Sequence, residues 1–177
     1  MNPDERLRQL ILYIAHKCLD DPHFGATKLN KILFWSDFTA YARTHRPITG
    51  AAYMKLPQGP APRRLVPVRQ QMVAAREIYL APTPKFDKIQ QRIVPAAGFN
   101  LSLFSAGDIA IVDEIIEAIK GKTGKELSAL SHGLAWQVTP DGGNIAYQAA
   151  YLSDEPLSEA DITRANELAA QRGWRED

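Results

Sequence analysis

The chain has 177 residues, with 21 Lys and Arg against 20 Asp and Glu and a formal net charge of +1. This balance gives no overall attraction to nucleic acid or acidic membranes, and the length fits a single domain over residues 1–177. Charged residues, Pro or Gly interrupt each apolar run before the ~20 residues that a membrane span needs. The acidic start of the chain argues against a signal peptide. Cys18 is the only cysteine, which excludes an internal disulfide. We therefore expect a cytoplasmic protein.

Two helices are predicted in the first 45 residues. Asn2, Pro3 and Glu5 form a start signal for the first one. The second should run from about Ala26 to His45. A helix that is apolar on more than one side is typical of the centre of a domain. The apolar residues of the second helix are Leu29, Ile32, Leu33, Phe34, Trp35, Phe38 and Tyr41.

The pattern then changes from helical to alternating. Tyr53–Leu56 predicts a short strand, and the proline-rich stretch after it, residues 57–62, predicts a constrained loop. A third helix is expected over about 64–78. Residues 78–80 and 91–94 flank a turn and predict a hairpin, which could extend the sheet begun by the first strand.

Capping signals mark helices in the second half of the chain. Ser105 with Asp108, and Thr123 with Glu126, predict two helix starts. Ser158 is expected to cap a final helix within residues 157–177. Together these elements predict an α+β, mainly helical fold, with five or six helices around a small two- or three-stranded antiparallel sheet.

Residues that could carry chemistry are scattered. The histidines and the cysteine lack the spacing of metal ligands, and the glycines lack the spacing of a phosphate loop, so no metal or cofactor is expected. Ser128 or Ser131 with His132 leaves a small Ser/His hydrolase as an alternative, although no nucleophile elbow accompanies them.

The third helix is locally basic, and its arginines are Arg63, Arg64, Arg69 and Arg76. A solvated helix face is the plainer interpretation. A surface for phosphate or for an acidic protein leaves a nucleic-acid-binding autoregulator as a further alternative. Among the tryptophans, Trp35 is expected in the core, Trp136 to hold a loop against the domain, and Trp174 to face a partner or to lie at a frayed end.

Two groups of motifs resemble a known family. The first group is Lys28-x-x-Lys31-Ile32-Leu33-Phe34-Trp35-x-Asp37, Pro47-Ile48-Thr49-Gly50-x-x-Tyr53 and Gly59-Pro60-x-Pro62. The second is Leu127-Ser128-x-x-Ser131-His132-x-x-x-Trp136. In order and spacing they resemble the Panacea domain family, also called SocA-like, over about residues 6–151. The segment 157–177 does not resemble the family pattern.

The resemblance implies a mostly helical antitoxin of bacterial or phage toxin–antitoxin systems, without enzymatic activity. Its partner would be a cognate toxin, neutralised by direct binding or delivered to a protease, and no membrane would be involved. The motif residues would be scaffold or partner contacts; they are Lys28, Lys31, Trp35, Asp37, Tyr53, Gly59, Pro60, Ser131, His132 and Trp136. Lys28, Lys31 and the Gly59–Pro60 loop are the positions to test for contact, because a lysine there is either a surface charge or a contact.

Overall fold

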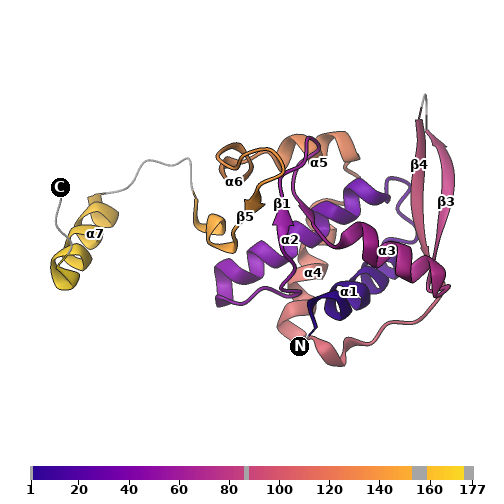
Figure 1. Cartoon of the computed structure of the whole chain (residues 1–177), viewed down its shortest axis with the longest axis horizontal. Helices are drawn as coiled ribbons and strands as arrows, with labels where there is room; N and C mark the ends of the chain where they lie inside the picture. Colours follow the sequence, from indigo (N-terminus) through magenta and orange to yellow (C-terminus); the bar gives the residue numbers. More distant parts are fainter. Residues whose placement is uncertain (1, 86–87, 153–158, 174–177) are drawn as a thin grey trace.

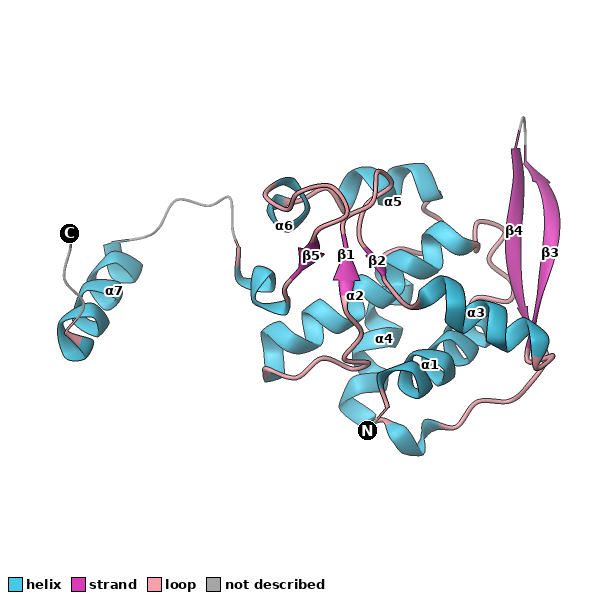
Figure 2. Ribbon diagram, viewed as in Figure 1, coloured by secondary structure: helices cyan, strands magenta, loops and turns pink. Residues whose placement is uncertain are grey.

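A computed structural model describes residues 2–85, 88–152 and 159–173 (Figure 1). Most of it is helical, and two small antiparallel sheets complete an α+β, mainly helical fold, as predicted. Figure 2 shows a main body of packed helices, a long hairpin that projects at one end, and a C-terminal helix that stands apart at the other. In the described part of the chain, no helix combines the length and the apolar character that a membrane crossing requires.

The first two helices form the centre of the main body. Helix α1 (Pro3–Lys17) begins as predicted, since the side chain of Asn2 accepts a hydrogen bond from the backbone N–H of Asp4. Helix α2 (Ala26–Thr44) packs against α1 and is buried along most of its length. It ends where His45 adopts a left-handed backbone with φ of 58°. The prediction of a central second helix is confirmed.

Two capping boxes position the helices that cover α2. Ser105 and Asp108 exchange side-chain and backbone hydrogen bonds at the start of α4 (Ala106–Ala118). Thr123 and Glu126 do the same at the start of α5 (Gly124–Leu130). Both helices pack on α2. The sequence predicts both starts because a capping box joins residues only three positions apart.

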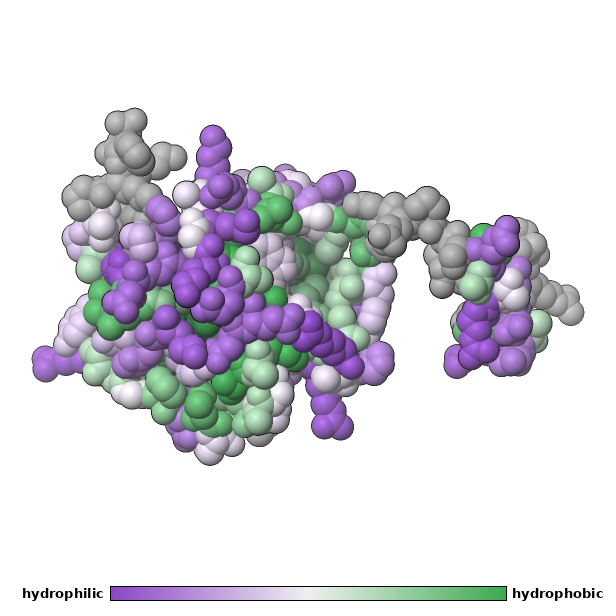
Figure 3. Space-filling model, turned by 180° about the vertical axis from the view of Figure 1, so that it is seen from behind, coloured by the Kyte–Doolittle hydropathy of each residue, from purple (hydrophilic) through white to green (hydrophobic). Residues whose placement is uncertain are grey.

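Short elements complete the second half of the chain: the 3-10 helices η1 (Leu101–Leu103) and η2 (Tyr147–Tyr151) and the four-residue helix α6 (Leu134–Gln137). Helix α7 (Glu159–Arg172) lies apart from the body. Seen from behind, polar and apolar side chains alternate over the body, and α7 presents a mostly polar face (Figure 3). The predicted cap Ser158 and the indole of Trp174 fall outside the described residues.

The third helix, α3 (Leu65–Ala74), is shorter than the predicted range of 64–78. Arg76 adopts φ of 56°, and the backbone N–H of Glu77 donates to the carbonyl of Met72, which closes the helix. The chain then enters the hairpin at once. The helical spacing of apolar residues up to Tyr79 misplaced the boundary, because the last of them belong to a strand.

The two sheets are separate, which corrects the prediction that the hairpin extends the first strand. In the three-stranded sheet, β1 (Tyr53–Met54) pairs with β2 (Ala61–Pro62) on one side and β5 (Asn144–Ile145) on the other. Strands β3 (Ile78–Lys85) and β4 (Lys88–Pro95) pair only with each other.

The separation follows from the two clusters of buried apolar side chains. The larger cluster joins α1, α2, α3 and α4 and includes Ile78 and Ile93 at the base of the hairpin. The smaller one contains Tyr53 and Ile145 of the three-stranded sheet together with Phe34 and Phe38 of α2. Because the hairpin and β1 belong to different clusters, they lie on different sides of α2. Trp35 is partly buried and packs against both clusters rather than lying fully in the core.

Candidate functional site

The two motif groups meet at the loop between β1 and β2. The carbonyl of Gln58 accepts hydrogen bonds from the Lys31 amine of α2 and, at 3.0 Å, from the Ser128 hydroxyl of α5. The Ser131 hydroxyl donates to the carbonyl of Ser128 at 2.9 Å. We call Lys31, Gln58, Gly59, Ser128 and Ser131 the loop hub. The hub fixes the proline-rich loop onto two helices that are distant in sequence.

Gly59 is the closest point of approach in the loop hub. Its φ of 99° lies in a region that side chains with a Cβ rarely adopt. A Cβ at this position would also clash with Nζ of Lys31 and Oγ of Ser131. Glycine is therefore required both by the backbone conformation and by the space that the two polar side chains occupy.

Lys31 is 1% exposed, so its charge lies inside the protein. Within the described residues its amine donates to the carbonyl of Gln58, and no carboxylate forms an ion pair with it. Burial lowers the pKa of its amine from 10.5 to about 8. This lysine is a buried and weakly compensated cation, not the surface charge that the sequence allowed.

Lys28, one helical turn earlier, is 2% exposed but has a carboxylate partner. Its amine lies 2.6 Å from Oδ2 of Asp21 and donates to the carbonyl of Lys122 at 3.2 Å. The pair ties the start of α2 to the turn after α1 and to the turn before α5. A direct contact of Lys28 with a partner would therefore require its amine to leave this ion pair.

Trp136 of α6 holds the other end of the loop, as predicted for an indole that pins a loop. Its Nε1–H donates to the carbonyl of Leu56 at 2.9 Å. The ring stacks on His132 with centroids 3.9 Å apart, and the Lys55 amine lies 4.1 Å from its centroid. Burial, with the nearby charges of Lys31 and Lys55, lowers the pKa of His132 and so favours the neutral ring.

Asp37 organises a second polar cluster beneath the three-stranded sheet. The fully buried carboxylate accepts hydrogen bonds from the backbone and the hydroxyl of Thr49, and from Tyr53 at 2.7 Å. The hydroxyl of Tyr147, on η2, lies 3.5 Å from Oδ2 of Asp37 and donates to the carbonyl of Ala51 at 2.6 Å. Burial raises the pKa of Asp37, while the bonds from Thr49 and Tyr53 act in the opposite direction. These contacts hold Asp37 and Tyr53 inside the protein.

An open groove lined mostly by apolar residues, which we call the apolar groove, lies next to the loop hub, where η2 passes α2 and α6. Its volume is about 160 Å³. Its lining residues are Phe34, Trp35, Leu130, Ser131, Gly133, Leu134, Ala135, Trp136, Ala149 and Leu152. Leu130 and Leu152 at its rim are 59% and 50% exposed. Large exposed aliphatic side chains around a concave surface are typical of a site that another molecule covers.

The serines do not pair with His132 as a hydrolase would require. Ser128 and Ser131 donate to backbone carbonyls, and the His132 ring stacks on Trp136. The Nε2 atom of His132 is buried, and no described residue forms a hydrogen bond with it. No cluster of three His, Cys, Asp or Glu residues that could hold a metal occurs in the described ranges.

One arginine of the basic face predicted on α3 is neutralised by a carboxylate, and another is held by neutral acceptors. Arg63 donates to Asn144 and to the carbonyl of Gly142, and Arg64 pairs with Asp4 at 2.7 Å. Arg64 is therefore paired with a negative charge, whereas Arg63 keeps its positive charge and is fixed in place by hydrogen bonds. A continuous track for a phosphate backbone is not formed by these two residues.

Comparisons with known proteins agree with the motifs. The family model described as antitoxin SocA-like, Panacea domain, matches residues 29–137. The match begins within α2, ends with α6, and includes the loop hub and much of the groove lining. It is narrower than the range of about 6–151 suggested by the motifs. No curated protein and no solved structure matches the chain.

Proposed function

Because the chain belongs to the antitoxin SocA-like Panacea domain family, we propose that it neutralises a cognate toxin by binding it directly. The family match over residues 29–137 is the observation that carries the proposal. A family of antitoxins also favours a role without catalysis, and the contacts of Ser128, Ser131 and His132 are in accord with that role.

We place the toxin contact at the apolar groove. The loop hub and Trp136 give its floor a defined shape, because hydrogen bonds from Lys31, Ser128 and Trp136 hold the surrounding elements. The groove has room for one or two apolar side chains, and the exposed Leu130 and Leu152 would be covered on binding. In this arrangement most motif residues support the surface instead of touching the toxin.

The first test is co-expression with the product of the adjacent reading frame. The neighbour should arrest growth alone, and this protein should restore growth. If the neighbour is harmless, or stays toxic in the presence of this protein, the proposed function is wrong. Measuring the level of toxin separates two routes: direct sequestration leaves it unchanged, whereas delivery to a protease lowers it.

Variants of the groove rim test the surface. Leu130→Glu and Leu152→Glu place a charge where apolar contact is proposed, and each should weaken toxin binding at least tenfold while the melting temperature stays close to that of the wild type. Leu19→Glu is the matched control, since Leu19 is 45% exposed and lies outside the groove. Equal toxin binding by all three variants would rule out this surface but leave the antitoxin role intact.

A further inference from the structure

Arg69 differs from the other arginines of the α3 region. Its Nε atom is buried, and no described residue forms a hydrogen bond or an ion pair with this side chain. Arg8, Arg63 and Arg64 nearby in the sequence or fold all have acceptors. An arginine donor left without an acceptor costs free energy, so its retention calls for an explanation.

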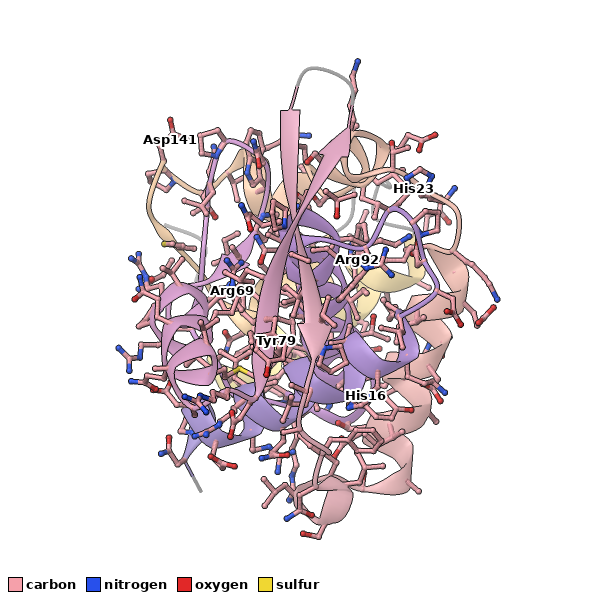
Figure 4. All side chains as sticks on the ribbon, turned by 90° about the vertical axis from the view of Figure 1, so that its right-hand side faces the viewer. His16, His23, Arg69, Tyr79, Arg92 and Asp141 are labelled. Carbon is pink, nitrogen blue, oxygen red and sulfur yellow. The ribbon has the colours of Figure 1, made fainter. Side chains whose placement is uncertain are left out.

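The surroundings of Arg69 are apolar and exposed. Val66 and Val73 lie three positions before and four positions after it, so the three share one side of α3. Val66 is 58% and Val73 38% exposed. Tyr79, 56% exposed, lies on β3, which packs on α3. Figure 4 shows Arg69 and Tyr79 on the side of the molecule from which the hairpin projects.

Arg69 and Tyr79 belong to residue types that protein contacts favour. Arg and Tyr are enriched among the residues that dominate interface energies, and aliphatic neighbours exclude water from them. Desolvation lowers the pKa of Arg69, with no compensating charge nearby. A carboxylate is the complementary group, because its two oxygens can accept from the terminal nitrogens of the guanidinium, which are not buried as Nε is.

A nucleic acid suits this surface less well. Phosphate backbones are bound by several cations in succession. Around Arg69, however, Arg64 is paired with Asp4 and Arg8 with Glu77, so these two neighbouring cations are already neutralised. One cation set among Val66, Val73 and Tyr79 fits a single carboxylate with apolar neighbours.

We propose that Arg69, Tyr79, Val66 and Val73 form a docking surface for an acidic protein segment, in which one Asp or Glu side chain pairs with Arg69 and flanking apolar residues cover the two valines and the tyrosine. This α3–β3 surface is distinct from the apolar groove and does not depend on the proposed function.

The test uses the full chain and a defined probe. An acetylated, amidated Leu-Glu-Leu peptide is titrated while NMR follows the arginine Nε–H signals and the Tyr79 ring. The Arg69 and Tyr79 signals should shift in a saturable manner, with a midpoint in the millimolar range. The matched Leu-Gln-Leu peptide should shift them at least tenfold less at equal concentration. Arg46, exposed in the turn after α2, serves as the control arginine.

Two variants and one competitor complete the test. Arg69→Met should abolish the peptide-dependent shift of Tyr79 without lowering the melting temperature, whereas Arg46→Met should change neither. Equal shifts with both peptides, or at Arg46 as at Arg69, would overturn the proposal. So would a marked loss of stability in Arg69→Met, which would make Arg69 a structural residue. A short DNA duplex that shifts Arg69 more strongly than the acidic peptide would assign the surface to nucleic acid instead.

Discussion

Lys28 and Lys31 lie one helical turn apart on α2, and both are almost fully buried. They differ in whether a carboxylate compensates the buried charge. Lys28 has the carboxylate of Asp21 at 2.6 Å. Lys31 has a backbone carbonyl and two nearby serines in the loop hub, and burial lowers its pKa to about 8. A buried cation is tolerated when a carboxylate neutralises it. Without a carboxylate, burial favours the neutral amine, so Lys31 changes its protonation state near physiological pH.

The largest expected effect on stability is at Gly59, whose backbone packs directly against the amine of Lys31. Gly59→Ala adds a Cβ that is strained at φ of 99° and clashes with Lys31 and Ser131. We expect a loss of about 4 kcal/mol in the free energy of unfolding, measured by urea denaturation. Gly50→Ala is the matched control, because Gly50 has φ of 73° but open space around its Cβ position. Equal losses for the two variants would mean that the loop hub is not tightly packed.

Removing the partner of Lys28 should have the next largest effect. Asp21→Asn leaves Lys28 buried with an uncompensated charge, and we expect a loss of about 3 kcal/mol. The neighbouring Asp20→Asn, at an exposed position, should change stability by less than about 0.5 kcal/mol. The double variant Asp21→Asn with Lys28→Met should recover most of the loss, since it removes the buried charge as well. If it does not recover, the contribution of Asp21 lies in the turn after α1 and not in the ion pair.

The pH dependence of stability sharpens the comparison. The folded-state pKa of Lys31, about 8, lies below the unfolded value of 10.5. Between these values the unfolded chain binds more protons, so stability rises as pH increases from about 8 to about 10.5. The gain is about 2 to 3 kcal/mol. Below pH 8 both states carry the proton, and the cost of burying the charge is fully present.

Lys31→Met supplies the reference for this measurement. Burial raises the pKa of the Cys18 thiol to about 11, which makes stability fall over an overlapping range of pH. Subtracting the unfolding free energy of Lys31→Met from that of the wild type at each pH cancels this contribution. The difference should rise with pH, and Lys31→Met should be at least as stable as the wild type at pH 7. A flat difference would show that Lys31 is already neutral or well compensated at pH 7.

The smallest effect concerns the second donor to Gln58. Ser128→Ala removes one hydrogen bond to a carbonyl that keeps the bond from Lys31. We expect a loss of about 1 kcal/mol in denaturation experiments. Ser102→Ala, at an exposed position in η1, is the control and should be neutral. A loss of several kcal/mol in Ser128→Ala would indicate that the serine, and not Lys31, is the main support of the loop.

Local interactions account for what the sequence could predict. The cap at Asn2 and the boxes at Ser105 and Thr123 join residues two or three positions apart. The central place of α2 follows from its apolar residues on all sides. Contacts between distant segments could not be predicted: the separate sheets, the ion pair of Lys28, and the pairing of Asp37 with Tyr147, 110 residues away. The sequence places charged and polar residues on α2 but carries no local signal for which loop receives them.

The Asp37 cluster determines which segment of this chain could be transplanted into another protein and still fold. The family match ends at residue 137, but Tyr147 lies ten residues later and reaches back to Asp37 and Ala51. At the other end, α1 precedes the match and supplies much of the larger buried cluster. A transplant of residues 29–137 alone would therefore expose apolar surface at one end and leave the polar cluster incomplete at the other. The smallest exchangeable unit that we expect to fold on a foreign chain spans about residues 2–152.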